Sequence, residues 1–155
     1  MADPVININE DTNTAFCACA SVNYHTYLKN ITLSDESEFM GTSIEVNLDA
    51  KGYLTEIYAS CLYIPQYNLT FEECLSKDYI KRMYGRDWNR YHGYCSCEAK
   101  GISEYFEKFA KPYFDKRVAE GKSLISPLDD ILNDTDFFSA KLFIENTCMD
   151  AWRVK

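Results

Sequence analysis

The chain has 155 residues, of which 24 are acidic and 16 basic, so its formal net charge at pH 7 is −8. A chain of this length can bury the core of one domain, while its acidity disfavours nucleic acids and anionic membrane surfaces as partners. No run approaches the about 20 apolar residues that cross a bilayer, so we expect one domain over residues 1–155 without membrane insertion.

The N-terminal part of the sequence contains a polar lead-in and the pattern of a first helix. The start at Met1 lacks the charged and apolar regions of a signal peptide. If the cysteines, taken up below, indicate an oxidising environment, we expect the mature form of an exported protein with a replaced initiator methionine. From Thr14 onward apolar residues recur at helical spacing, which predicts a helix over about residues 14–30. Ser34, an N-cap followed by acidic residues, predicts a short second helix that ends by Gly41.

The middle of the chain carries two further helix patterns. An apolar stripe over about residues 48–63 predicts a helix that Pro65 stops. Thr70 opens the pattern of a capping box, in which side chains satisfy the free backbone donors of a helix start. Gly85 is a typical C-terminal cap, so this helix is expected over about residues 70–84.

The C-terminal half contains the clearest helix pattern. Apolar residues from Cys95 to Tyr113 advance in steps of three and four, and Pro112 is expected to bend or end the helix. Pro127 marks another helix start, and a last helix is expected from about Thr135. Because no convincing strand pattern appears, the predicted fold class is all-α, a disulfide-stapled helical domain.

Two passages of the sequence share one pattern. Residues Phe16–Cys19 and Tyr94–Cys97 each read aromatic-Cys-x-Cys, and each is followed at a distance by one more cysteine, Cys61 or Cys148. This repetition predicts two diverged copies of one helical unit. The two units and the helix that connects them are expected over about residues 14–66, 88–155 and 70–84.

Cysteine usage indicates the compartment. There are 7 cysteines in the chain, more than a cytosolic enzyme normally carries, and this favours an oxidising environment. We therefore expect a periplasmic or secreted protein. In a helix, residues two apart are rotated by about 200°, so the sulfurs of a CxC segment point to nearly opposite sides and reach different neighbours.

Equivalent positions and distances from the turn near Gly85 favour one set of disulfides. The favoured pairs are Cys19–Cys61, Cys74–Cys95 and Cys97–Cys148. Helical phase alone would also allow Cys17 or Cys95 to take the place of its CxC partner, and Cys74 has Cys17 as an alternative. Since seven is odd, Cys17 is expected to be a free thiol, or to join two chains as a homodimer.

The sequence contains no recognisable motif for catalysis or metal binding. Structural zinc usually takes CxxC segments, and neither His25 nor His92 has a partner at a recognisable catalytic or metal-binding spacing. No motif of a hydrolase or nucleotide enzyme occurs. We expect no cofactor, no metal and no enzymatic activity. The alternatives are a secreted effector or enzyme of unfamiliar type with a cleft between the halves, and a thiol redox or metal module.

Tyrosine content favours a binding surface. The chain has 12 tyrosines, more than a core of this size needs, and tyrosine is common in protein interfaces; the alternative is ordinary surface tyrosines. An acidic surface suits a basic protein partner. The candidate interface residues are Asp35, Glu36, Glu38, Tyr63 and Tyr67.

The CxC helices resemble those of small helical periplasmic proteins of bacteria, among them immunity proteins against type VI secretion amidase effectors. The residues that carry the resemblance are Cys17, Cys19, Cys61, Cys95, Cys97 and Cys148. It implies an exported, non-enzymatic protein that inhibits a cell-wall-degrading toxin by binding it. This chain departs from that family because it is longer and carries the unit twice.

Overall fold

The structure is a computed structural model, and it describes residues 10–30, 53–122 and 127–153. Within these residues the chain is helical and contains no strand, which confirms the predicted all-α class. Its elements in chain order are α1 (Glu10–Asn30), the π-helical turn η1 (Tyr53–Tyr58), the 3-10 turn η2 (Ala59–Cys61), α4 (Tyr63–Ser76), α5 (Asp78–Tyr84), α6 (Trp88–Ala119), α7 (Pro127–Leu132) and α8 (Thr135–Trp152).

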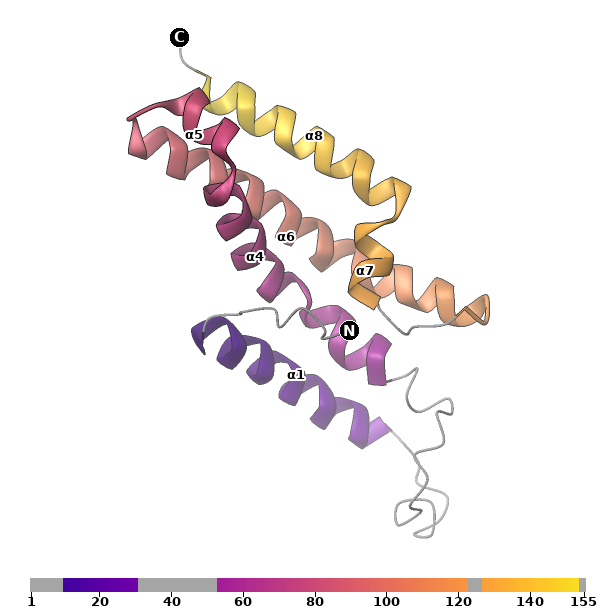
Figure 1. Cartoon of the computed structure of the whole chain (residues 1–155). Coiled ribbons are helices and arrows are strands. Elements are labelled where there is room, and N and C mark those ends of the chain that lie inside the picture. Colours follow the sequence, from indigo (N-terminus) through magenta and orange to yellow (C-terminus); the bar gives the residue numbers. More distant parts are fainter. Residues whose placement is uncertain (1–9, 31–52, 123–126, 154–155) are drawn as a thin grey trace, which may run out of the picture.

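Helix α6 is the central element, and the other elements described pack on or near it (Figure 1). It begins where the Asp87 side chain accepts a hydrogen bond from the backbone N–H of Arg90 at 3.2 Å. Lys116 and Arg117 lie in its last turn, where positive charge is favourable. Its buried side consists of Tyr91, Tyr94, Cys95, Glu98, Ala99, Ile102, Phe106, Ala110 and Phe114.

The core has two clusters along α6. The first surrounds Phe106 and includes Ile131 of α7 and Phe137 of α8. The second lies toward the start of α6, where Ile80 and Tyr84 of α5 pack with the tyrosines and cysteines of the neighbouring helices. Apolar burial of this kind holds α5 and the end of α8 against α6.

Helices α6 and α8 run antiparallel and approach closely at two glycines. A Cβ atom added to Gly93 would lie 2.3 Å from the Trp152 ring, and one added to Gly101 would lie 2.5 Å from Ile144. Between these contacts, the disulfide Cys97–Cys148 joins the same two helices. The absence of side chains at both glycines therefore lets α8 settle directly on the backbone of α6.

Proline does not stop the helical segment before α4. Pro65 was predicted to end it, but the chain passes from η2 directly into α4, and Pro65 is buried in the first turn of that helix. A proline is tolerated there because its missing N–H would have no partner within α4. Similarly, α6 continues through Pro112 to Ala119, so Pro112 does not end it.

The capping box predicted at Thr70 is wrong, because Thr70 is buried within α4 and the helix continues to Ser76. The break comes at Lys77, whose extended backbone has φ −70° and ψ 112°. Gly85 caps α5 as predicted, with a positive φ of 60° that glycine adopts easily. Helices α7 and α8 begin at Pro127 and Thr135, as expected.

Some predictions fall on parts of the chain that the structure does not describe. The helix predicted to begin at Ser34 and the first residues of the 48–63 segment lie there. Helix α1 covers the predicted range 14–30 and begins four residues earlier, at Glu10, where Glu10 and Asp11 complement the helix dipole.

Candidate functional site

Three disulfides join the helices, and they are the three pairs that the sequence favoured. Their Cα atoms are 5.9 Å apart in Cys19–Cys61, 5.5 Å in Cys74–Cys95 and 5.8 Å in Cys97–Cys148, within the usual range for a disulfide. Cys17 is a free, exposed thiol, also as expected.

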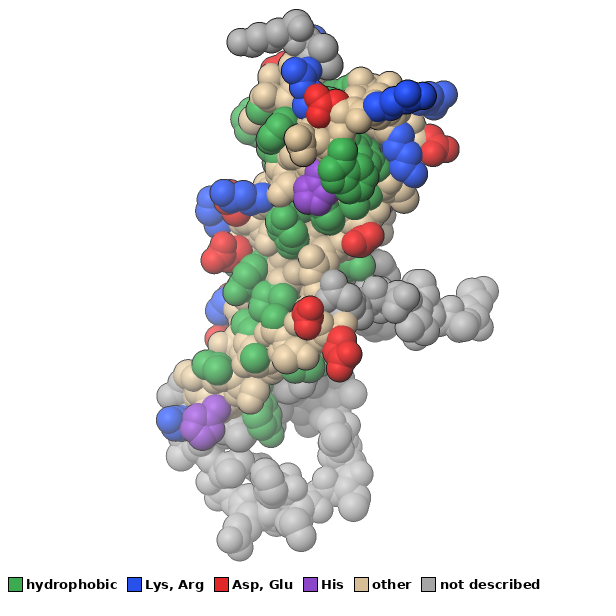
Figure 2. Space-filling view, turned by 90° about the vertical axis from the view of Figure 1, so that its left-hand side faces the viewer, with side chains coloured by type: hydrophobic (Ala, Val, Ile, Leu, Met, Phe, Trp, Pro, Cys, Tyr) green, Lys and Arg blue, Asp and Glu red, His purple; other side chains and the backbone are tan. Residues whose placement is uncertain are grey.

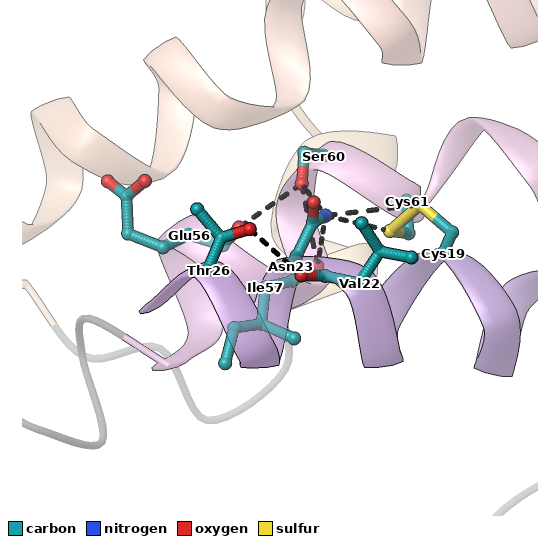
Figure 3. The surroundings of a disulfide bond; sticks show 8 residues. All are labelled: Cys19, Val22, Asn23, Thr26, Glu56, Ile57, Ser60 and Cys61. Carbon is teal, nitrogen blue, oxygen red and sulfur yellow. Dashed lines mark hydrogen bonds between the residues drawn. A yellow bond between two sulfur atoms is a disulfide. The ribbon is translucent and has the colours of Figure 1, made fainter. Parts of the chain in front are cut away.

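The first disulfide is surrounded by a local hydrogen-bond network (Figure 3). The Asn23 side-chain amide of α1 donates to the Ser60 hydroxyl at 2.7 Å and lies 3.1 Å from the Cys61 sulfur and 3.4 Å from the Ile57 carbonyl. The Glu56 carboxylate points away from the disulfide and pairs with Lys111 of α6 at 2.7 Å. The contacts around this disulfide thus fasten α1 to η1 and η2, and they assemble no acid, base or nucleophile.

The proposed interface residues have different surroundings. The ring of Tyr63 packs against the Phe106 core cluster, and its carbonyl accepts a hydrogen bond from Ser103 at 2.9 Å, so Tyr63 joins α4 to α6. The Tyr67 hydroxyl lies 3.0 Å from the Ser96 hydroxyl, at the edge of the same pair of helices. Asp35, Glu36 and Glu38 lie outside the described residues.

A line of aromatic side chains crosses from α4 to the start of α6, and we call it the aromatic ridge; it comprises Tyr67, Phe71, His92, Trp88 and Tyr91. Ring centroids lie 6.2 Å apart for Tyr67 and Phe71 and 4.9 Å apart for Phe71 and His92. Trp88 follows, 5.8 Å from His92 and 5.6 Å from Tyr91. Trp88 is the most exposed of these rings, at 62%.

An open cavity of about 450 Å³ lies beside the ridge. Its lining residues are Trp88, Asn89, His92, Gly93, Ser96, Cys97, Lys100 and Trp152. Both tryptophans of the chain therefore face one cavity, although 64 residues separate them in sequence (152 − 88). Apolar side chains form a band along the face shown in Figure 2, and a histidine lies among them near its upper end.

Sequence reasoning missed Trp88, His92 and Trp152 as site residues. The one available signal was that Trp88 and Trp152 are the only tryptophans in the chain. Their proximity depends on the antiparallel packing of α8 on α6 and on the glycine at position 93, which no local pattern reveals.

A buried ion pair joins Lys77, which lies between α4 and α5, to Glu98 of α6. The Glu98 carboxylate is fully buried, and one of its oxygens lies 3.1 Å from the ammonium group of Lys77. Burial opposes the charged form of Lys77, but Glu98 and Glu73 outweigh it and raise the pKa of the ammonium group. Burial, and then the Glu98 charge, raise the pKa of Glu145 on α8. No cavity reaches Glu98 among those described, so this pair joins the α4–α5 link to α6.

Comparison with known proteins finds no relative for this chain: no protein-family model, curated protein or solved structure matches it. Among the described residues, no helix is long and apolar enough to span a membrane, and no group of histidine, cysteine and acidic side chains is arranged to hold a metal ion. The fold defines a disulfide-stapled, all-α protein with an exposed aromatic surface.

Proposed function

We propose that this is a non-enzymatic protein that acts in the periplasm or outside the cell and binds another protein through the aromatic ridge. The observation that carries the proposal is the exposed Trp88 ring, which lies between neighbouring rings and an open cavity. Tryptophan and tyrosine are enriched among the residues that dominate the binding energy of protein interfaces.

The disulfides support this proposal because they hold the ridge in one shape. Cys74–Cys95 joins the two helices that carry the ridge, and Cys97–Cys148 fixes the end of α8 beside the cavity. A binding surface that is rigid before the partner arrives loses little conformational entropy on binding. Disulfides of this kind persist in oxidising compartments, which supports the location outside the cytoplasm.

A narrower form of the proposal names the partner class. The net charge of −8 suits a basic partner, and the resemblance of the CxC helices to those of immunity proteins suggests a cell-wall-degrading effector enzyme. The protein would then inhibit the toxin by covering its active-site cleft. Electrostatic attraction would speed association, while the aromatic ridge would provide most of the affinity.

Calorimetric titration of the protein into a secreted toxin encoded beside it tests the proposal. We expect tight binding, and we expect Trp88→Ala to weaken it by about 30-fold or more, the loss typical of a central interface tryptophan. The matched control is Phe143→Ala, which removes an aromatic ring that is 73% exposed on α8 and lies outside the cavity.

Two results would contradict this function. Absence of binding together with absence of protection in a growth assay would refute the toxin-inhibitor form. Equal binding by Trp88→Ala and Phe143→Ala would show that the ridge is not the interface.

A further inference from the structure

The cavity beside the aromatic ridge presents both apolar rings and polar groups to a ligand. Its apolar surfaces are the indole rings of Trp88, at the start of α6, and Trp152, at the end of α8. Its volume of about 450 Å³ lies in the range typical of sites for small molecules. The cavity is open to solvent, so a ligand can reach both rings without a change in the packing of the helices.

The polar groups of the cavity lie on one face of α6, because they follow one another in steps of three and four residues. They are Asn89, His92, Ser96 and Lys100. This face borders α4 where the Ser96 hydroxyl lies 3.0 Å from the Tyr67 hydroxyl. It borders α8 where the Trp152 ring lies against Gly93. The cavity therefore has a polar floor beside two indole rings.

These polar side chains can make hydrogen bonds to a ligand. The amide of Asn89 both donates and accepts hydrogen bonds, and a neutral imidazole such as that of His92 has one donor and one acceptor. The Ser96 hydroxyl pairs with Tyr67, and a hydroxyl group has the capacity for a further hydrogen bond. A ligand with several hydroxyl groups would match this floor.

The charge of the cavity differs from that of the whole chain. The formal net charge is −8, yet no acidic side chain lines this cavity among the described residues, whereas Lys100 does. The Lys100 side chain is 73% exposed, and its ion-pair partner Glu104 lies 3.9 Å away and outside the cavity. The exposed ammonium group favours a ligand that carries a negative charge.

The combination of indole rings, hydrogen-bonding groups and one ammonium group favours one class of ligand. An apolar molecule would cover the rings but leave the polar floor unused, and a small inorganic anion would pair with Lys100 but leave the rings unused. A sugar ring has apolar C–H faces whose hydrogens are slightly positive, and these stack on the negative faces of aromatic rings. Its hydroxyl groups surround the ring and form hydrogen bonds.

We propose that this cavity binds an acidic saccharide. The sugar rings stack on Trp88 and Trp152, the hydroxyl groups pair with Asn89 and Ser96, and a carboxylate pairs with Lys100. This is a ligand site in addition to the proposed protein interface. Binding of a saccharide is measured with this protein alone, so the outcome is independent of any protein partner.

The test titrates methyl β-glucuronide and methyl β-glucoside into the full chain and follows the indole N–H signals by NMR. The chain has 2 tryptophans, and both line the cavity, so each indole signal reports on it. The two glycosides differ only where a carboxylate replaces a hydroxymethyl group. We expect both to bind saturably and to shift both signals, and the glucuronide to bind about two- to fivefold more tightly, the gain typical of an exposed ion pair.

Three variants make the result specific. Lys100→Gln should abolish the preference for the glucuronide and leave the affinity for the glucoside unchanged. The matched control Lys108→Gln removes an exposed lysine of the same helix that does not line the cavity, and it should keep the preference. Trp88→Ala changes an exposed side chain, so the fold is retained, and it should weaken binding of both glycosides about tenfold.

Four results would overturn the saccharide site. They are the absence of saturable shifts of the indole signals with either glycoside, equal affinity of the wild type for both glycosides, a preference that Lys100→Gln retains, and unchanged binding by Trp88→Ala.

Discussion

The two CxC segments share a sequence pattern but differ in their surroundings. In α6, Cys95 bonds to α4 and Cys97 bonds to α8, so the helix is clamped from two sides. In α1, Cys19 bonds to Cys61 of η2, while Cys17 is exposed and free. The same local pattern therefore supports a central helix in one place and a helix fastened on one side in the other.

The difference shows what the CxC pattern determines. Helical geometry sends its two sulfurs to opposite sides wherever it occurs, but a disulfide forms only where a second neighbour lies on the far side. Within the described residues, α1 packs on η1, η2 and α4, whereas α6 has α4 and α5 together with α7 and α8. That the two segments are diverged copies of one unit stays a prediction.

The largest expected effect comes from comparing a buried ion pair of α6 with an exposed ion pair near α1. Lys77→Met would leave the fully buried Glu98 unpaired, and we expect it to lower the free energy of unfolding by about 3–5 kcal/mol. Lys111→Met removes a half-exposed partner of Glu56 near α1, and we expect a loss of at most about 1 kcal/mol. Chemical denaturation of both variants measures the difference.

A double variant is the control for this comparison. Replacing both Lys77 and Glu98 with methionine removes the uncompensated charge, so it should restore most of the stability lost in Lys77→Met. Equal losses in Lys77→Met and Lys111→Met would contradict the buried role of Glu98.

The next effect compares the disulfide that holds α1 with the disulfide that joins α6 to α8. The pairs Cys19–Cys61 and Cys97–Cys148 close loops of similar sequence separation, 42 and 51. The chain-entropy estimate therefore gives about 4 kcal/mol for each. We expect the serine double variant of the first pair to speed amide hydrogen exchange in α1 alone, and that of the second pair to speed it throughout α6 and α8. If α1 kept its protection without Cys19–Cys61, its other contacts would suffice to hold it.

The smallest effect concerns the free thiol. The native, unreduced protein should take up one alkyl group, on Cys17, as measured by intact mass. Cys17→Ser should take up none, and its stability should match the wild type within about 0.5 kcal/mol, as is usual for an exposed position. Alkylation of Cys95 or Cys97 in the unreduced protein would contradict the double clamp of α6.

The sequence predicted those features that local geometry controls. The equivalence of the CxC segments led to Cys19–Cys61 and Cys97–Cys148, and distance from the turn near Gly85 led to Cys74–Cys95. Gly85 marked the end of α5 because its positive φ suits glycine. The predictions from Pro65 and Thr70 were wrong because tertiary packing stabilises α4 across both positions, which local rules treat as helix boundaries. Packing of apolar faces outweighs propensities of this size.

The candidate sites were less predictable than the fold. The aromatic ridge combines rings from α4 and α6, and its cavity adds Trp152 from the end of the chain. Of the interface residues proposed from sequence, only Tyr67 lies in the ridge.

The positions of the two tryptophans determine which part of the protein its fluorescence reports on. Both indole rings line one cavity at the contact of α6 and α8, and α1 contains no tryptophan. Tryptophan fluorescence, excited at a wavelength where tyrosine does not absorb, therefore follows the separation of α6 from α8 and does not report the loss of α1. Circular dichroism counts helical residues wherever they are, so detachment of α1 before the rest would separate the two unfolding curves.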